Sequence, residues 1–584
     1  MVIKMTGTNE LKARANRLLL EWCDTLLGFR VSGTGSPYTD GGLICPACHV
    51  IHGRNADLVF PLTLLWDETG DQRYLDAAEK LVEWTDFNLT RPDGSWRNDA
   101  GSEWKGISAF GAMALGETLF HYEPKLPERL ARRWRELFCR LARFCVRLPE
   151  VSKPVINYYA GLACVLAMAE RLTGDALFGR EADRWEAYCR RNFSPDGLLA
   201  GEGYPSGGST PHNGVSERGC HHIDMGYDLE ESLPLLLRHA VLRGDGEKLN
   251  FYKARLLDHL EFLLPDGAID NSWGTRHNKW TYWGSRTSDG LLEGLALVCD
   301  EPIFANAVER VLSIYERCTS GGLLSLPMAA QAGEPTCLHH SFCHAKALAS
   351  FILADSIAEP GGALPREREY GTKSFQNGNL LLVSAGGWRA TFSTIDIANY
   401  RGVDVGGGSI RLLWHERIGP VCAASMADYY PSEPLNMQYL RKTDQTPCTT
   451  PMLRFPDGRR SVMESGVGLT ADGSSVRVSG GDWSAVWSFS EDRVDISVRA
   501  ADAELSLPLI CPPDESAVCD GRTLFVGESL ILASDADISV DTTERLFNQV
   551  PGFCCLGVRL PVRGELKLSL RAKQVSLSPG RTAR

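Results

Sequence analysis

The sequence contains no low-complexity tract and no apolar run close to the roughly 20 residues that a membrane-spanning helix requires. Its first seven residues lack the apolar core of a secretory signal peptide. From these absences we expect a folded protein with no membrane partner, cytoplasmic as written, or periplasmic or secreted if a leader was removed. Basic residues are also in the minority, and the net charge is −12. This balance argues against a nucleic-acid binder, although a cleft for a polyanion can still be locally positive.

Disulfides are not expected, although the chain has 18 cysteines. Several stand inside apolar helical patterns, as buried reduced thiols do: Cys23, Cys139, Cys145 and Cys164. Cys45 and Cys48 form a CxxC motif beside His49 and His52. A second group of such residues follows late in the helical half: Cys337, His339, His340, Cys343 and His344. Together they could supply the four ligands of a structural zinc site, but helix packing and hydrogen-bonded histidines are the favoured explanation. We predict no metal ligands and no required cofactor, with a structural divalent metal left open.

The chain changes character near residue 360. Before it, apolar residues recur at helical spacing, as in Ile107–Phe120 and Leu130–Val146. After Gly371, short alternating runs broken by Gly, Asp and Ser are typical of strands. The sequence predicts an α+β multidomain protein: a helical domain over 1–360, an antiparallel β-sheet or β-sandwich domain over 371–575, and a flexible tail over 576–584.

A faint repeat runs through the helical half. Gly-Asp follows an apolar helix and opens another at Gly70-Asp71, Gly174-Asp175 and Gly244-Asp245. Gly suits the C-terminal cap of one helix and Asp the N-cap of the next. Repeated helical hairpins of this kind predict an (α/α)6–7 toroid, with an irregular helical bundle or solenoid as the alternative.

Aromatic and cationic residues gather in loops that a toroid would place around its central cleft. Between Asp270 and Asp289 the sequence has no acidic residue, and cations alternate with aromatic rings. Rings stack on sugars, and Arg binds carboxylate or sulfate. The alternatives are a packing loop with solvated cations or a single-stranded nucleic-acid groove. The predicted substrate-binding residues are Arg276, His277, Lys279, Trp280, Trp283, Arg286, Trp273, Trp104, Lys105, Trp96, His52, Arg54 and Tyr158.

A second loop is rich in histidine. His212, His221 and His222 precede Asp224, a predicted helix N-cap that places Tyr227 in the first turn of the next helix. Asn157 stands directly before another long apolar helix. Each of these residues also has a plain structural explanation, in a turn or a hydrogen-bonded loop.

The helical repeats, the Asn at a helix start, the later His/Tyr loop and the trailing β domain resemble the heparinase II/III-like polysaccharide lyases, with polysaccharide lyase family 35 nearest. The resemblance implies that Asn157 neutralises a uronate carboxylate, that Tyr227 acts as acid or base, and that His212, His221 or His222 assists. A further His would be His344 or His415. Relatives often place a His where Tyr158 stands, and the zinc site that several carry in the β domain is not expected here.

The resemblance implies β-elimination at C4–C5 of a uronate in an acidic polysaccharide such as chondroitin, hyaluronan or heparan. Two alternatives remain open. An α/α-barrel glycoside hydrolase of the unsaturated glucuronyl hydrolase type would need paired carboxylates, for which Asp99, Asp224, Asp270 and Asp289 are candidates. A non-catalytic glycan-binding protein would need only the aromatic residues.

Overall fold

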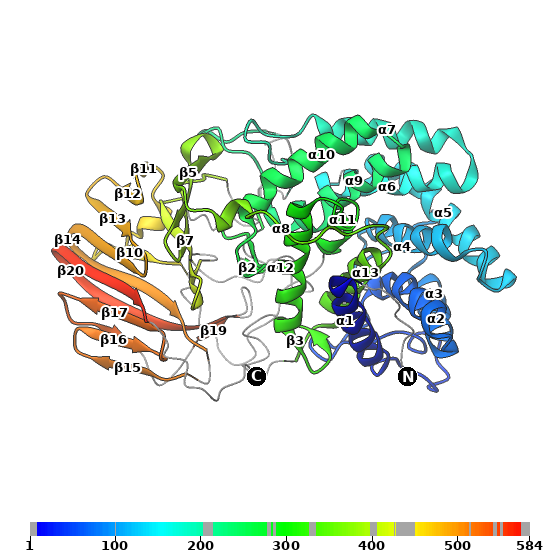
Figure 1. Cartoon of the computed structure of the whole chain (residues 1–584), viewed down its shortest axis with the longest axis horizontal. Helices are drawn as coiled ribbons and strands as arrows, with labels where there is room; N and C mark the ends of the chain where they lie inside the picture. Colours follow the sequence, from blue (N-terminus) through cyan, green and yellow to red (C-terminus); the bar gives the residue numbers. More distant parts are fainter. Residues whose placement is uncertain are drawn as a thin grey trace.

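The computed structural model describes residues 9–99, 101–152, 154–202, 214–276, 282–283, 288–325, 335–397, 406–424, 427, 450–512, 515–540, 546–548 and 553–573. The helices and the larger part of the strands separate along the long axis of the molecule (Figure 1). None of the described helices is both long and apolar enough to cross a membrane.

Over the described residues the helical part is a closed ring of hairpins. Its inner helices are α2 (Val59–Thr69), α4 (Ile107–Tyr122), α6 (Ile156–Thr173), α9 (Leu233–Arg243), α11 (Leu292–Leu295) and α13 (Leu338–Ile352). Each inner helix contacts the next, and α13 contacts α2. The outer helices are α1 (Glu10–Leu27), α3 (Gln72–Leu89), α5 (Glu128–Ser152), α7 (Ala176–Arg190), α10 (Gly246–His259) and α12 (Pro302–Cys318). The predicted toroid is confirmed, with six pairs.

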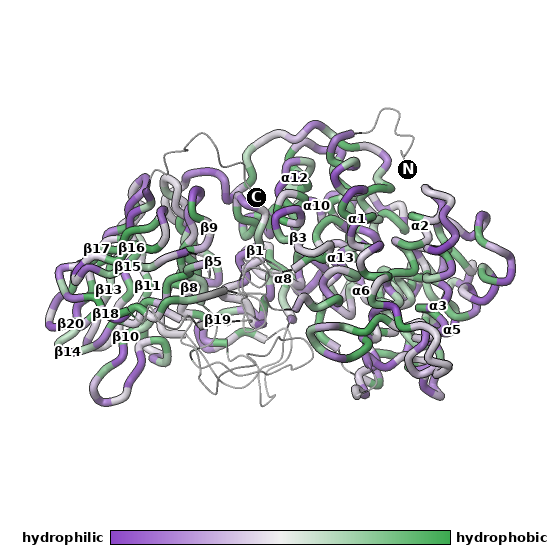
Figure 2. The backbone as a smooth tube through the Cα atoms, turned by 90° about the horizontal axis from the view of Figure 1, so that it is seen from below, coloured by the Kyte–Doolittle hydropathy of each residue, from purple (hydrophilic) through white to green (hydrophobic). Residues whose placement is uncertain are grey.

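Inner and outer helices differ in their hydrophobic pattern. In the inner helix α4, every residue from Ile107 to Leu119 is buried. The outer helix α5 buries one stripe, including Leu130, Trp134 and Leu141, and exposes its charged face. A helix that is apolar all round belongs in a core, whereas an amphipathic one covers it. In Figure 2 the apolar segments accordingly lie mostly inside the molecule.

The Gly-Asp repeat acts as predicted. Gly70, Gly174 and Gly244 end their helices in the left-handed conformation, with φ of 71°, 76° and 64°. The following Asp71 and Asp175 each accept a hydrogen bond from a backbone N–H in the first turn of the next helix, as Asp245 does at α10.

The β part contains two antiparallel sheets. The smaller has the order β5 (Gly371–Phe375), β6 (Leu380–Ala385), β7 (Trp388–Ser393), β8 (Ser409–His415) and β9 (Gly419–Ala423). The larger contains β11 (Gly468–Asp472), β12 (Ser475–Ser479), β13 (Trp483–Phe489), β14 (Arg493–Ile510), β20 (Phe553–Ala572), β17 (Leu530–Ser534), β16 (Thr523–Val526) and β15 (Ala517–Asp520), in that order. Short strands pair at its side: β10 (Met452–Arg454) with β14, and β18 (Ser539–Val540) and β19 (Leu546–Asn548) with β20.

The five-stranded sheet is the middle layer of the molecule. Along β6 and β8, Val383 and Leu413 face the core between the two sheets. Their neighbours Leu382, Leu412 and Trp414 belong to the core of the toroid. This alternation is the period of a strand buried on both faces. The five-stranded sheet therefore packs on the toroid with one apolar face and on the larger sheet with the other.

Shorter elements connect these layers. They are η1 (Gly53–Leu58), α8 (Met225–Tyr227), η2 (Asp228–Ser232), η3 (Leu260–Phe262), β1 (Ile269–Asp270), β2 (Tyr282–Trp283), β3 (Thr319–Ser320), β4 (Leu323–Leu324), η4 (Pro365–Glu367), η5 (Gln376–Gly378) and η6 (Ser461–Met463). Several of them carry the candidate functional residues.

Candidate active site

The candidate residues gather where the inner helices begin. Asn157 and Tyr158 lie in the first turn of α6, Tyr227 lies in α8, and Arg54 lies in η1, ahead of α2. Trp104 stands just before α4. Because the inner helices surround one axis, side chains from segments far apart in the sequence meet at this end of the ring.

Asn157 is bound to an acidic residue that the sequence did not single out. Its Nδ2 donates to Oε2 of Glu231 over 2.7 Å, and both side chains are buried. Burial, together with nearby Asp289, raises the pKa of Glu231 to about 8, although Arg54 and Asn157 act in the opposite direction. Glu231 therefore holds its proton to a higher pH than an exposed glutamate does.

Glu231 lies in a widened helical turn. Residues Asp228–Ser232 form a π-helix between α8 and α9. Single π-helical turns within α-helices are frequent at functional sites, because they shift a side chain out of the regular helical register.

Tyr227 faces a cation. The guanidinium carbon of Arg276 lies 4.6 Å from the centre of the Tyr227 ring. Asp224 connects the two residues, since its Oδ1 accepts from the backbone N of Tyr227 and its Oδ2 from that of Arg276, over 3.1 and 2.8 Å. Arg276 also forms an ion pair of 3.0 Å with Glu202. The predicted N-cap at Asp224 is confirmed, and it positions both residues of this pair.

Tyr158 is held differently. Trp104 Nε1 donates to its hydroxyl over 2.8 Å, and the two rings meet edge to face. Gly106 makes this possible, because a Cβ there would lie 2.2 Å from the Tyr158 ring. Burial and the neighbouring Glu231 raise the pKa of Tyr158 well above its ordinary value. A phenol in this setting keeps its proton.

The five-stranded sheet braces the segment that carries Arg276. Asp270 in β1 accepts a hydrogen bond from the Thr391 hydroxyl of β7 and lies 3.9 Å from Arg366. Arg411 of β8 donates to the backbone O of Ser272 over 3.0 Å. The β part thus fixes one side of the candidate site as well as covering the toroid.

The comparisons with known proteins agree with this architecture. The model of the ulvan lyase N-terminal domain matches residues 19–365, and that of the ulvan lyase C-terminal domain matches residues 372–465. A broad-specificity ulvan lyase of Formosa agariphila is 35% identical over 444 residues, which cover 74% of this chain and 68% of the relative. The chain belongs to the ulvan lyase family.

Solved structures show the same fold at low identity. The chondroitin AC lyase of Streptomyces coelicolor A3, in complex with chondroitin sulphate, superposes with a TM-score of 0.52 at 11% identity. The match covers 98% of this chain and 80% of that one. The predicted enzyme class, a polysaccharide lyase of the toroid type, is confirmed, and the family within it is that of the ulvan lyases.

Three predicted sugar-binding tryptophans are core residues in this ulvan lyase family member, and those predictions are wrong. Trp96 has no exposed surface and lies against Gly111 of α4. Trp273 packs on Phe262, and Trp283 stacks on Tyr315 with ring centres 5.4 Å apart. The described parts of these loops therefore turn the three rings into the interior of the fold. Trp104 is the half-buried exception.

Two predicted substrate-binding residues near the N-terminus are also directed inward. Arg54 is buried and pairs with Asp57, Asp289 and Glu231. His52 is buried beside Cys337, with Nε2 3.7 Å from its Sγ. Neither side chain is presented to a polymer. Lys105 is half-buried and binds Asp93 over 2.6 Å.

The predicted histidines separate into different environments. His222 is buried, and its carbonyl accepts from the backbone N of Gly201 and Glu202, which ties it to the Arg276 ion pair. The backbone N of His221 donates to Gln376 Oε1 of η5 over 2.8 Å, and the residue is half-buried. His344 is fully buried, 3.3 Å from Glu230.

His415 lies far from this end of the ring. It packs on Trp388 in the core between the two sheets, with ring centres 4.5 Å apart, and burial lowers its pKa to about 4. The structure therefore separates it from Asn157 and Tyr227. The remaining predicted residues lie outside the described ones: His212, His277, Lys279, Trp280 and Arg286.

Sequence reasoning missed the buried carboxylates Glu231 and Glu202. A signal was available for the first, since Asp228, Glu230 and Glu231 interrupt an otherwise apolar helical stretch. Charges at such positions are rarely buried unless they are paired or have a function.

Among the residues that the structure describes, two groups of side chains have the composition of metal ligands. Asp57, Asp289 and Cys343 form the first, but Arg54 and Lys346 already neutralise its carboxylates, with Lys346 Nζ 2.8 Å from Asp289. The second contains Cys45, Cys48, Cys337 and His52.

Proposed function

We propose that this protein cleaves ulvan by β-elimination at a uronate residue, in place of the glycosaminoglycans expected from the sequence. The observation that supports this proposal most directly is the 35% identity of the chain to a broad-specificity ulvan lyase. Asn157, Tyr227 and Arg276 lie within the stretch that matches the N-terminal family domain, residues 19–365.

β-Elimination begins at C5 of the uronate. The C5 proton is weakly acidic while the adjacent carboxylate carries a full negative charge, so the enzyme must stabilise the charge that develops there. Asn157 has a second amide hydrogen for this carboxylate, beyond the one given to Glu231. Because burial raises the pKa of Glu231, the Asn157–Glu231 pair repels the substrate less than an exposed carboxylate would.

Tyr227 is proposed as the base and the subsequent acid. Its phenolate oxygen takes the C5 proton, the electron pair forms the C4–C5 double bond, and the C4–O bond breaks. The departing oxygen then takes the proton from Tyr227. Arg276, whose guanidinium carbon is 4.6 Å from the ring centre, is the described cation that faces Tyr227 during this transfer. Tyr158, whose raised pKa opposes formation of a phenolate, is the less suited of the two tyrosines to abstract the proton.

The assisting histidine is proposed to be His222, ahead of His221. His222 is buried beside the backbone of Glu202, the partner of Arg276. The backbone of His221 is instead bound to Gln376 of η5, in the β part. Trp104 and Arg276 are the described residues proposed to contact the polymer, together with His277, Lys279, Trp280 and Arg286. The elimination itself requires no cofactor.

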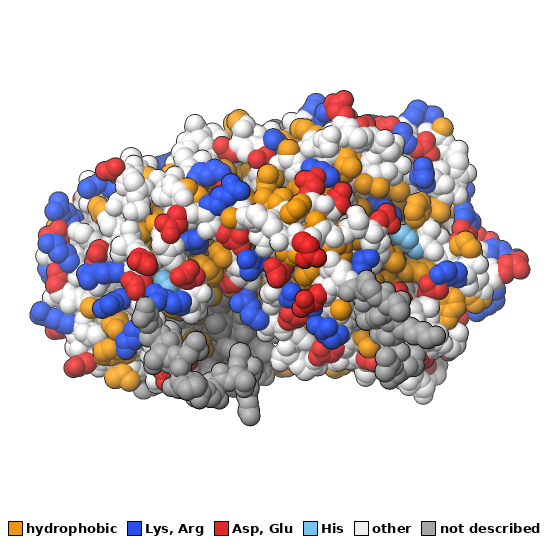
Figure 3. All heavy atoms as spheres, in the orientation of Figure 1, with side chains coloured by type: hydrophobic (Ala, Val, Ile, Leu, Met, Phe, Trp, Pro, Cys, Tyr) orange, Lys and Arg blue, Asp and Glu red, His pale blue; other side chains and the backbone are white. Residues whose placement is uncertain are grey.

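The substrate is a polyanion, yet the protein is acidic. On the face shown in Figure 3, Lys and Arg are interspersed with Asp and Glu over both the helical and the β parts. Attraction of the substrate therefore depends on cations local to the site, of which Arg276 is one.

The test is incubation of the purified protein with ulvan, chondroitin, hyaluronan and heparan, each in a separate reaction. The C4–C5 double bond of the product is followed by its ultraviolet absorbance, and new reducing ends are counted in parallel. The expected result is matched growth of both signals on ulvan. If absorbance increases with a glycosaminoglycan but not with ulvan, the proposed substrate is wrong. If reducing ends form without the double bond, the proposed reaction is wrong.

A further inference from the structure

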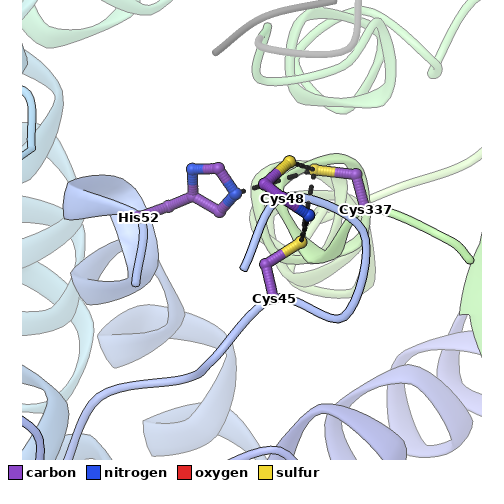
Figure 4. A group of neighbouring side chains, drawn as sticks. All are labelled: Cys45, Cys48, His52 and Cys337. Carbon is purple, nitrogen blue, oxygen red and sulfur yellow. Dashed lines mark hydrogen bonds between the residues drawn. The ribbon is translucent and has the colours of Figure 1, made fainter. Parts of the chain in front are cut away.

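Four metal-ligating side chains meet at the joint between the first and last parts of the toroid. Cys45, Cys48 and His52 come from the segment between α1 and η1, and Cys337 is the residue directly before α13 (Figure 4). Their ligand atoms all lie within 4.8 Å of one another. Three of the four are buried, and Cys48 is partly so.

The spacing of these atoms matches a tetrahedral ion. Cys337 Sγ lies 3.8 Å from Cys45 Sγ, 3.6 Å from Cys48 Sγ and 3.7 Å from His52 Nε2. Zinc binds sulfur at about 2.3 Å and imidazole nitrogen at about 2.0–2.1 Å. A regular tetrahedron with those bonds has sulfur–sulfur edges of about 3.8 Å and sulfur–nitrogen edges of about 3.5 Å.

The backbone around Cys45 is shaped to present sulfur. The segment Cys45-Pro-Ala-Cys48 turns sharply, so that the backbone N of Cys48 donates to Cys45 Sγ over 3.4 Å. The turn is closed by the N of His49 bonding to the O of Cys45, and His49 takes a left-handed φ of 58°. An N–H donated to a sulfur stabilises a thiolate, which is the form that binds metal.

We propose that Cys45, Cys48, His52 and Cys337 bind one structural zinc ion. The ion would have four protein ligands and no open position, which distinguishes a structural zinc site from a catalytic one. Three thiolates and an imidazole suit zinc and do not suit magnesium or calcium, which prefer oxygen. A disulfide is the competing chemistry, but it joins only two of the three thiols and requires sulfurs about 2.05 Å apart.

The proposed ion would close the ring of helices. Cys45 and Cys337 are 292 residues apart in the sequence, and the ion would tie the segment entering η1 to the start of α13. Those two elements also share an ion-pair network, since Arg54 of η1 and Lys346 of α13 both bind Asp289. Zinc would thus hold Arg54 in place beside Glu231, and its role is to position, not to react.

Metal analysis of the purified full-length chain tests this directly. The expected result is about one zinc per chain, with X-ray absorption showing a shell of three sulfurs and one nitrogen. Replacement of zinc by cobalt should give the visible absorption of thiolate-bound tetrahedral cobalt. No stoichiometric zinc after expression in zinc-supplemented medium, or a shell of oxygen ligands, would overturn the proposal.

Matched variants separate the site from general damage. Cys337→Ala should lose the zinc and lower the melting temperature. Cys145→Ala removes an equally buried thiol from the outer helix α5 and should keep one zinc per chain. His52→Cys, which retains four ligands, should also keep it. Because a misfolded Cys337→Ala is uninformative alone, mass analysis after thiol alkylation of the native chain gives the second measurement. Three alkylated thiols at 45, 48 and 337 after zinc removal are expected, and a disulfide among them would refute the site.

Discussion

Asn157 Nδ2 lies 2.7 Å from Glu231 Oε2, although the two residues are 74 positions apart in the sequence. The contact joins an amide at the start of α6 to an acid in the π-helical turn before α9. The site is rich in buried carboxylates, and this contact gives one of them an amide partner.

Replacing Asn157 should slow catalysis far more than it weakens the fold. Asn157→Ala removes the amide proposed to stabilise charge at the uronate carboxylate, and a single such donor is worth about 10²–10³ in kcat. Initial rates on ulvan measure the loss. Asn306→Ala is the matched control, because Asn306 is a buried amide on the outer helix α12 that donates to the O of Gly362. It should cost stability and leave kcat unchanged. Equal rate losses in both variants would refute the role of Asn157.

The raised pKa of Glu231 predicts a pH-dependent stability. Below pH about 4.5 the acid is protonated in both folded and unfolded chains. Between there and about pH 8, the unfolded chain ionises while the folded one holds its proton, so Glu231 costs stability as the pH rises. The slope is at most about 1.4 kcal/mol per pH unit.

Glu231→Gln should remove that slope. The difference in unfolding free energy between variant and wild type, from chemical denaturation, should move in favour of the variant from pH 4.5 to 8 and then level off. A difference that stays constant over this range would mean that Glu231 is already ionised in the folded protein.

The two tyrosines should respond differently to loss of their hydroxyls. Tyr227→Phe should lower kcat by about 10²–10⁴, the usual contribution of an acid–base group, with little change in KM. Tyr158→Phe removes a hydroxyl that accepts from Trp104 and should cost less than tenfold. Steady-state kinetics on ulvan distinguish them. If Tyr158→Phe is the more damaged enzyme, the roles assigned to the two residues are reversed.

Residues close in sequence predicted the arrangement of helix ends in the toroid. The Gly-Asp repeat predicted three helix junctions because caps depend on residues close in sequence. The N-cap at Asp224 was predicted for the same reason, and the position of Tyr227 in the first turn of the following helix was predicted from it.

Burial of the loops could not be predicted in this way. Trp283 lies in a loop rich in cations and aromatics, and only the fold shows that it stacks on Tyr315. The acidic residues of η2 stand out in the sequence, but only the fold shows that Glu231, among them, contacts Asn157 of α6. The Cys45–Cys337 contact likewise depends on closure of a ring 292 residues long, which no local pattern specifies.

The bond between Thr391 and Asp270 tests whether the β part supports the active site. Thr391→Val keeps the shape of the side chain but leaves the buried carboxylate of Asp270 without one donor, which should cost about 1–3 kcal/mol. Because Asp270 is six residues before Arg276, KM for ulvan should rise as well. Thr118→Val is the control, since its buried hydroxyl donates only to the O of Ala114 within α4. Denaturant unfolding and steady-state kinetics on both variants decide the matter. If KM rises in Thr391→Val and not in Thr118→Val, the sheet helps to position Arg276. If Thr391→Val is destabilised with an unchanged KM, the sheet stabilises the fold without positioning the site.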